Sequence, residues 1–376
     1  MSDPNRNNGG SRQISAMGAY SLAEILSQPQ CWRDLLKLLQ NADVIGEIEK
    51  SFGKCSELLF VGCGSSYYVA LAAAASWTAI TGRRARAVPA SELLLFPDLI
   101  FTGMADFVPV LISRSGHTSE VLRVAELFRR KNIPSIAIFC TSKNPLQELV
   151  TIPILLPGVD EQSTVMTRSF TSMLLCLQYV AATLAGKPDF IQELHTLPVT
   201  AEKVLHNLPM RVREFASQNR FADYVCLGQG PYFGLACESG LKLTEMSCSY
   251  TQAFHTLEFR HGPKSVVSRE TLIIFLLSQS NYAAEADVLE EIKELGGTTL
   301  VVANRIDDRA RAAADFIVEL DSDAPEYSCI APFVLAGQLL GLYTALHKGL
   351  DPDRPRNLSR VVILKDEKMQ PENAEI

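Results

Sequence analysis

The sequence lacks the features that mark a metalloprotein, a membrane protein or a nucleic-acid-binding protein. Its nine cysteines are scattered singly, with no Cys-x-x-Cys pair and no histidine set at metal-ligand spacing, so we expect no metal site and a reducing cytoplasm. We find no apolar stretch of the roughly 18 residues that a membrane-spanning helix needs. The net charge of −7, with both signs interspersed, argues against nucleic acid and membrane surfaces as partners.

The composition is sufficient for two ordinary domain cores, because 47% of the 376 residues are hydrophobic. Residues 1–16 are polar, contain no hydrophobic signal region, and are predicted to form a disordered tail. Leucines, isoleucines and a tryptophan at helical spacing predict a helical lead-in over residues 17–53.

From residue 54 onward, short apolar runs alternate with helical patterns. We predict strands over residues 57–61, 107–112, 135–139 and 151–156, with helices over about 67–81 and 120–130. Strands that are apolar throughout, mostly followed by a helix, are typical of a parallel sheet covered on both faces. Ligands of such sheets bind at the carboxyl ends of the strands.

Hydroxyl side chains gather at two of these strand ends, in turns that contain glycine. Glycine lets backbone N–H groups approach an anion, and a helix N-terminus favours negative charge, so the turns predict a site for a phosphate. The alternative is that these residues only cap helices. The nucleotide-loop spacing is absent and Gly62-x-Gly64 lacks a third glycine, so we expect no cofactor such as NAD. The residues concerned are Gly64, Ser65, Ser66, Ser113, Ser115 and Thr118.

The strand pattern then repeats at an offset near 165 residues, which indicates a duplicated domain. Residues 223–230, 272–280, 299–303 and 316–320 match the first four strands in order. The second copy has 278–283 (Ser-Gln-Ser-Asn-Tyr-Ala) where the first has 113–118 (Ser-Arg-Ser-Gly-His-Thr). We therefore expect the first copy, residues 54–198, to bind the phosphate. The second, residues 199–345, should supply the chemistry, and residues 346–376 should close the site.

The candidate chemistry lies on one helix of the second copy. Glu238, Lys242 and Glu245 fall at i, i+4 and i+7, which places two carboxylates and an ammonium on one face. The surrounding residues are apolar, so the helix should be packed inside the protein, where burial moves a carboxyl pKa toward the range of a general base. The alternative is an ordinary ion pair on a helix surface. Downstream, His261 lies between an arginine and a Gly-Pro turn.

Together, several motifs resemble the sugar isomerase (SIS) domains, in the tandem arrangement of the isomerase half of glucosamine-6-phosphate synthase. They are the Cys-Gly-Ser-Ser turn at 63–66, the Ser-x-Ser-Gly-x-Thr loop at 113–118, Glu-x-x-x-Lys-x-x-Glu at 238–245 and Glu-x-x-His-Gly-Pro at 258–263. The C-terminal segment Asp-Pro-Asp-Arg-Pro-Arg-Asn-Leu at 351–358 is the fifth. Residues 166–171 and 259–265 look closest to the tagatose-6-phosphate ketose/aldose isomerase group, which includes galactosamine-6-phosphate deaminase/isomerases. The resemblance implies two α/β domains, each a flavodoxin-like three-layer sandwich.

The resemblance also implies roles for individual residues. Glu245 would move a proton between C1 and C2 of a sugar phosphate, supported by Glu238 and Lys242. His261 would assist ring opening, reaching in from a neighbouring subunit of a homodimer or a dimer of dimers. Aldose–ketose interconversion needs such a carboxylate together with a donor for the carbonyl oxygen. The sugar phosphate would be held by Gly64, Ser65, Ser66, Ser113, Arg114, Ser115, Thr118 and Thr167.

The sequence departs from the synthase pattern in two ways. The glutaminase half is missing, so we expect no transfer of glutamine nitrogen. The synthase pattern also places a lysine after Pro-Arg-Asn-Leu, where it can form an imine with the ketose, whereas this chain has Arg360. Because arginine stays protonated, we expect Arg360 to clamp an oxyanion or the phosphate instead. Lys365 is too far along the chain to replace that lysine.

We therefore expect a cytoplasmic enzyme without a cofactor: an amino-sugar or sugar 6-phosphate deaminase or aldose–ketose isomerase that yields a ketose 6-phosphate. Two alternatives remain. A non-catalytic sugar-phosphate sensor would need the phosphate loop but not the proton shuttle. A deglycase of sugar-amine 6-phosphates would use the same base and differ only in the pocket around C2.

Overall fold

The computed structural model describes residues 16–52, 55–103 and 106–364 of the chain. Most of the predicted tail, residues 1–15, and Lys365 lie outside the described residues. The structure contains two parallel sheets with the same strand order, as expected for a duplication. The predicted fold class, two α/β repeats with parallel sheets, is confirmed.

The first sheet has the order β2-β1-β3-β4-β5 and the second has the order β7-β6-β8-β9-β10. The eight predicted strands are confirmed, but β2 and β7 were not predicted. Both are edge strands with few fully buried positions, so they lack the apolar run that identified the others. The strands are β1 (Glu57–Gly62), β2 (Arg84–Pro89), β3 (Phe107–Ile112), β4 (Ile136–Phe139), β5 (Ile152–Leu155), β6 (Asp223–Gly228), β7 (Tyr250–Phe254), β8 (Thr271–Leu276), β9 (Thr298–Ala303) and β10 (Phe316–Glu319).

The predicted helical lead-in is confirmed as α1 (Ala19–Leu26), α2 (Gln28–Gln40) and α3 (Asp43–Phe52). The helices of the first copy are α4 (Ser65–Thr81), α5 (Ala90–Leu95), α6 (Pro97–Phe101), α7 (Ser119–Arg130), α8 (Arg168–Leu184) and α9 (Pro188–Leu194). Those of the second are α10 (Leu197–Leu205), α11 (Leu208–Gln218), α12 (Pro231–Ser247), α13 (Tyr282–Glu294), α14 (Asp308–Ala313) and α15 (Leu335–His347). Short 3-10 turns are η1 (Pro145–Glu148), η2 (Glu258–Arg260), η3 (Pro263–Val266), η4 (Glu326–Cys329) and η5 (Ala331–Val334).

Each sheet is covered on both faces. Along β1, Leu58 and Phe60 belong to the large core between the sheets, whereas Leu59 and Val61 belong to a separate core under α5 and α7. Successive strand residues point to opposite faces, so one apolar run fills two cores. The second sheet packs in the same way against α13 and α14.

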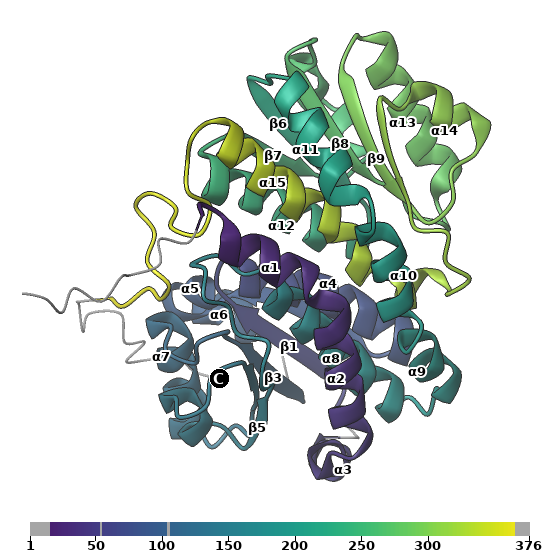
Figure 1. Ribbon diagram of the computed structural model, residues 1–376. Coiled ribbons are helices and arrows are strands. Elements are labelled where there is room, and N and C mark those ends of the chain that lie inside the picture. Colours follow the sequence, from purple (N-terminus) through teal and green to yellow (C-terminus); the bar gives the residue numbers. More distant parts are fainter. Residues whose placement is uncertain (1–15, 53–54, 104–105, 365–376) are drawn as a thin grey trace, which may run out of the picture.

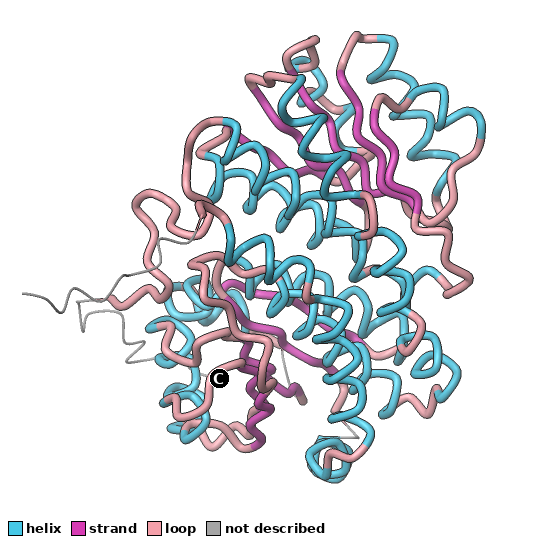
Figure 2. The backbone as a smooth tube through the Cα atoms, in the orientation of Figure 1, coloured by secondary structure: helices cyan, strands magenta, loops and turns pink. Residues whose placement is uncertain are grey.

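Helices from both copies form the layer between the two sheets (Figures 1 and 2). There α12 packs against α4 and α15, and α4 packs against α8. Glycine makes these contacts close: a Cβ on Gly234 of α12 would lie 2.7 Å from the Ala72 nitrogen of α4, and one on Gly341 of α15 would lie 2.9 Å from the Lys242 carbonyl oxygen. The helix α12, which carries the predicted acid/base residues, is thereby fixed between the two copies.

One expectation about apolar stretches was wrong. The helical segment Glu326–His347 has 22 residues and contains an 18-residue window with a mean hydropathy of 1.7, enough in length and composition to cross a membrane. However, 89% of its apolar window is buried inside the protein, in the layer between the sheets. The segment was missed because its apolar residues are interrupted by small and polar ones such as Gly337 and Gln338, both of which are packed in the core.

Candidate active site

The first turn of the predicted phosphate site joins β1 to α4. Gly62 has no room for a side chain, since a Cβ would lie 2.6 Å from the Ser66 carbonyl oxygen. Gly64 has a φ of +55°, which glycine adopts most readily. The turn therefore brings the start of α4 directly to the end of β1, with Ser65 and Ser66 in the first helical turn. Both serines are buried.

The second turn joins β3 to α7 and is held by its own side chains. Gly116 has a φ of +66°, and a Cβ there would lie 2.2 Å from Asn144 Oδ1. The Gly116 N–H donates to Ser113 Oγ at 3.1 Å, and Ser113 Oγ lies 3.2 Å from Thr118 Oγ1. From the turn after β4, Thr141 Oγ1 donates to the Ser115 carbonyl at 2.6 Å. The loop is thus fixed, leaving the Ser115 side chain at the pocket.

The two turns face one pocket of about 200 Å³. The carboxyl ends of β1 and β3 form one side, and a chain segment after α15, Leu358–Val362, forms another. The Ser119 N–H donates to the Val362 carbonyl at 3.3 Å, which holds this segment against the start of α7. Eight predicted residues line the pocket: Gly64, Ser65, Ser66, Arg114, Ser115, Thr118, Glu245 and Arg360.

The remaining predicted residues do not line this pocket. Ser113 is buried within the turn, and its hydroxyl is hydrogen-bonded to Thr118 Oγ1. Thr167 is fully buried beside the start of α8, and its N–H donates to Glu161 at 2.9 Å. His261 is exposed at the end of η2 in the second copy. His117 is also exposed, and its ring contacts the carbonyl of Ser115 in its own loop.

Glu238, Lys242 and Glu245 share one face of α12, as predicted. The Lys242 side chain is fully buried, and its ammonium bonds to Glu245 and lies 3.3 Å from Glu238 Oε1. It also donates to Ser65 Oγ of α4 at 3.2 Å. The Glu245 side chain is 20% exposed and reaches the pocket, whereas that of Glu238 has no exposure. Lys242 therefore links the carboxylates to the first turn of the predicted phosphate site.

Burial gives Glu238 and Lys242 shifted pKa values. Burial raises the pKa of Glu238 to about 7, although Lys242 partly opposes this shift. For Lys242, burial acts to lower the pKa, but the carboxylates of Glu238 and Glu245 outweigh it and raise the pKa above its ordinary value. Lys242 is therefore an ammonium at neutral pH, while Glu238 titrates near neutrality beneath it.

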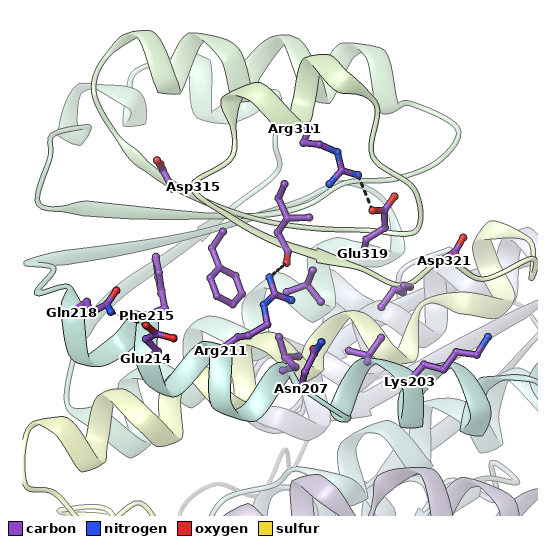
Figure 3. A pocket seen from close by; sticks show the side chains of 16 residues that line it. Lys203, Asn207, Arg211, Glu214, Phe215, Gln218, Arg311, Asp315, Glu319 and Asp321 are labelled. Carbon is purple, nitrogen blue, oxygen red and sulfur yellow. Dashed lines mark hydrogen bonds and ion pairs between the residues drawn. The ribbon is translucent and has the colours of Figure 1, made fainter.

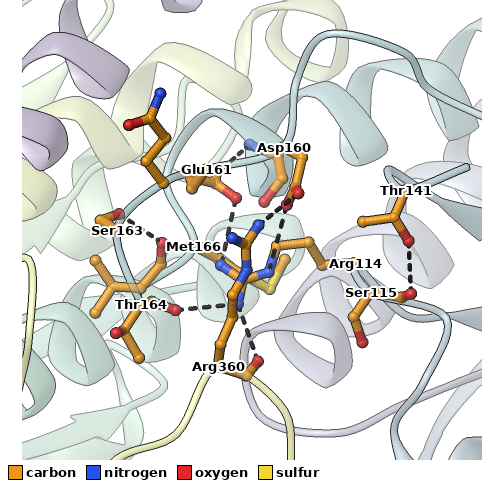
Figure 4. A network of polar contacts seen from close by, with 12 residues as sticks. Arg114, Ser115, Thr141, Asp160, Glu161, Ser163, Thr164, Met166 and Arg360 are labelled. Atoms are coloured by element: carbon orange, nitrogen blue, oxygen red, sulfur yellow. Dashed lines mark hydrogen bonds and ion pairs between the residues drawn. The ribbon is translucent and has the colours of Figure 1, made fainter.

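The pocket contains a polar network that the sequence analysis did not predict (Figure 4). The guanidinium of Arg114 donates to the carbonyls of Thr164 at 3.0 Å and Arg360 at 3.1 Å, and pairs with Glu161 at 3.4 Å. The side chain of Arg360 pairs with Asp160. Asp160 and Glu161 were missed because they lie between β5 and α8, in a segment with no periodic pattern. Two adjacent acidic residues before a helix rich in hydroxyl side chains could have indicated a polar site there.

The corresponding loop of the second copy is already occupied by side chains of the protein. The backbone N–H groups of Gln279 and Ser280 donate to Glu326 Oε1 at 2.8 and 3.4 Å. At the end of β6, Pro231 and Tyr232 follow the glycine turn where the first copy has two serines. Proline has no N–H to donate. These differences favour the first copy as the place where an anion binds.

A larger pocket of about 820 Å³ lies elsewhere, between α10, α11 and the edge strand β10 (Figure 3). None of the predicted site residues lines it. Several of its charged side chains are engaged: Arg211 donates to the Ile317 carbonyl at 2.6 Å, and Arg311 pairs with Glu319 at 2.8 Å. The volume of a pocket therefore does not identify the active site, and the smaller pocket is the better candidate for it. Among the described residues, no group of three or more His, Cys, Asp or Glu side chains could hold a metal ion.

The fold and pocket define a two-copy α/β protein with a polar site at the carboxyl ends of one parallel sheet. The SIS domain family matches residues 51–183 and 224–342, more than half of the chain. The chain belongs to this family, and the tandem arrangement inferred from the motifs is confirmed.

The chain is also similar to individual proteins of known sequence or structure. The chain is 23% identical to the glutamine–fructose-6-phosphate aminotransferase (isomerizing) of Methanothermobacter thermautotrophicus, over 94% of this chain but 60% of that protein. It thus spans about 60% of the length of the curated relatives that it matches. Among solved structures, it resembles the glucosamine-6-phosphate deaminase of Thermotoga maritima, with 28% identity, a TM-score of 0.72, and coverage of 92% of this chain and 100% of that one. The tagatose-6-phosphate ketose/aldose isomerase of Escherichia coli shares the fold, with 22% identity, a TM-score of 0.82 and coverage of 93% and 97%.

Proposed function

We propose that the protein is a cytoplasmic enzyme that converts an amino-sugar or sugar 6-phosphate to a ketose 6-phosphate. The observation that carries the proposal is the position of Glu245. Its carboxylate lines the same pocket as the two hydroxyl-bearing glycine turns, and it is bonded to a fully buried ammonium. A candidate base, Glu245, and a candidate phosphate site, the two turns, therefore line the same small pocket.

The phosphate is proposed to bind between the two turns. Ser65, Ser115 and Thr118 line the pocket, and α4 and α7 begin at these turns, so the positive ends of both helices lie beside it. Such a site holds a phosphate by hydrogen bonds and helix dipoles without a metal ion. The phosphate then fixes the far end of the sugar, which leaves C1 and C2 to meet Glu245.

Glu245 is proposed to act as the base that moves the proton. In the open-chain sugar it would take the proton from C2 and return it to C1, so that C1 is reduced and C2 is oxidised within one molecule. For an amino sugar the product is an imine at C2, which water hydrolyses to the ketone and ammonia. For a hydroxy sugar the ketone forms directly. The Lys242 ammonium is bonded to Glu245 and lies 3.3 Å from Glu238 Oε1, so it holds the proposed base in place on α12.

His261 is proposed to assist ring opening from a second subunit, because it is exposed and lies outside the pocket of its own chain. Coexpression of Glu245→Gln and His261→Asn chains tests this arrangement. If the site is shared, mixed dimers contain one intact site, and a random mixture should recover about a quarter of the wild-type activity. If each chain uses its own histidine, the mixture stays inactive.

The function is tested by mixing the purified protein with glucosamine 6-phosphate, galactosamine 6-phosphate and the corresponding plain aldose phosphates, and measuring ammonia and ketose. Ammonia and ketose in equal amounts identify a deaminase, and ketose without ammonia identifies an isomerase. Tight binding of these compounds without turnover would contradict the enzyme proposal and leave a sugar-phosphate sensor. Turnover of larger sugar-amine 6-phosphates alone would indicate a deglycase.

A further inference from the structure

Asp160 contacts two arginines, Arg114 and Arg360, both of which line the candidate pocket (Figure 4). One of its oxygens, Oδ2, pairs with Arg360, which lines the pocket. The other, Oδ1, is 4.0 Å from Arg114 Nε and is buried without completing a hydrogen bond. A single carboxylate therefore serves two guanidinium groups at the place where an anionic substrate would arrive.

The two arginines are held very differently. Arg114 is 6% exposed and donates to two backbone carbonyls, those of Thr164 and Arg360, so its guanidinium is fixed. Arg360 is 40% exposed, and the side-chain contact that holds it is the pair with Asp160, itself 29% exposed. Exposed ion pairs contribute little to stability, because water and salt compete with them. Arg360 is therefore the partner that can move.

We propose that Asp160 is a positioning residue that holds Arg360 beside the pocket and competes with the substrate phosphate for it. A phosphate dianion offers more charge and more acceptor oxygens to a guanidinium than one carboxylate does. On binding, Arg360 turns from Asp160 to the phosphate. After Arg360 has turned away, Arg114 Nε still lies 4.0 Å from Asp160 Oδ1, so the carboxylate keeps one positively charged neighbour.

The inference rests on the proposed function, since it assumes a phosphate in this pocket. In this scheme Arg360 binds the phosphate, and Asp160 sets how readily Arg360 does so. Because the competition weakens binding, removing the Asp160 charge should strengthen it. A residue that only anchored Arg360 would have the opposite effect, and this difference makes the inference testable.

The test measures the binding of inorganic phosphate and of glucosamine 6-phosphate by calorimetry, in the wild type and in Asp160→Asn, Arg360→Gln and the double variant. Asp160→Asn should bind about two- to fivefold more tightly, and its KM should fall by the same factor with kcat nearly unchanged. Arg360→Gln should bind more weakly, and adding Asp160→Asn to it should change nothing. The matched control is Asp323→Asn, which breaks another Arg–Asp pair, that with Arg305 at 2.6 Å, far from this pocket.

Weaker or unchanged binding by Asp160→Asn would overturn the inference, as would an Asp160→Asn effect that persists without Arg360. Thermal unfolding of each variant shows whether it is folded, and Asp160→Ser provides a second uncharged variant for the same comparison. Phosphate binding without turnover in the wild type would sink the proposed reaction while leaving the Asp160 comparison decisive. No phosphate binding in any variant would overturn both.

Discussion

Replacing Glu238 with glutamine should change how the stability of the protein depends on pH. The pKa of Glu238 is raised by burial to about 7 in the folded protein, against an ordinary value of 4.5. A carboxyl group with a raised pKa stabilises the fold while it is protonated, and this stabilisation is lost as the pH rises through the folded pKa. The Glu238 side chain has no exposure, so solvent does not screen the effect. Linkage with these two values gives a loss of about 2–3 kcal/mol between pH 5 and pH 8.

Urea unfolding from pH 5 to pH 8 measures this loss. The free energy of unfolding of Glu238→Gln should fall less steeply with pH than that of the wild type, by about 2–3 kcal/mol over the interval. Glu126→Gln on the exposed face of α7 is the matched control and should follow the wild type. Equal slopes for wild type and Glu238→Gln would refute the reasoning, because Lys242 would then keep Glu238 ionised throughout.

Three further predictions concern other parts of the molecule. Gly116→Ala should lower the free energy of unfolding in urea by about 1–3 kcal/mol more than Gly158→Ala does. Both positions have a positive φ, but only at Gly116 would the new Cβ contact a neighbour, Asn144. Glu285→Gln should also flatten the fall of stability from pH 5 to pH 8, measured in the same way, because burial raises the pKa of Glu285 to about 7. Ser115→Ala should weaken phosphate binding about tenfold or more in calorimetry, since Ser115 lines the pocket where a charged acceptor is proposed and the variant loses its hydroxyl donor.

The sequence predicted well what depends on regular patterns. Parallel strands such as β1 and β8 are buried along their whole length and apolar after their first residue, so length and bounding turns identify them. The spacing of Glu238, Lys242 and Glu245 predicted a shared helix face, which α12 confirms. The edge strands β2 and β7 were missed because partial exposure removes the apolar signal that their neighbours have.

Contacts between distant segments could not be predicted from spacing. Lys242 donates to Ser65 because Gly234 lets α12 approach α4 closely, a contact between two copies that no local pattern contains. Asp160 meets Arg360 across 200 residues, in two segments without periodicity. Arg360 was expected to be free for a ligand, and its pairing with Asp160 depends on how the segment after α15 returns to the first copy. Such pairings are decided by tertiary packing.

The most direct test of the central claim is proton exchange at the substrate. The protein is mixed with glucosamine 6-phosphate in deuterium oxide, and loss of the C2 proton and appearance of deuterium at C1 are followed by NMR, with Glu245→Gln and Glu126→Gln compared. The account predicts exchange in the wild type and in Glu126→Gln, and a rate about 10²–10⁴-fold lower in Glu245→Gln, the range expected for the loss of a general base. Undiminished exchange in Glu245→Gln would contradict the account, because the proton would then be moved by another group.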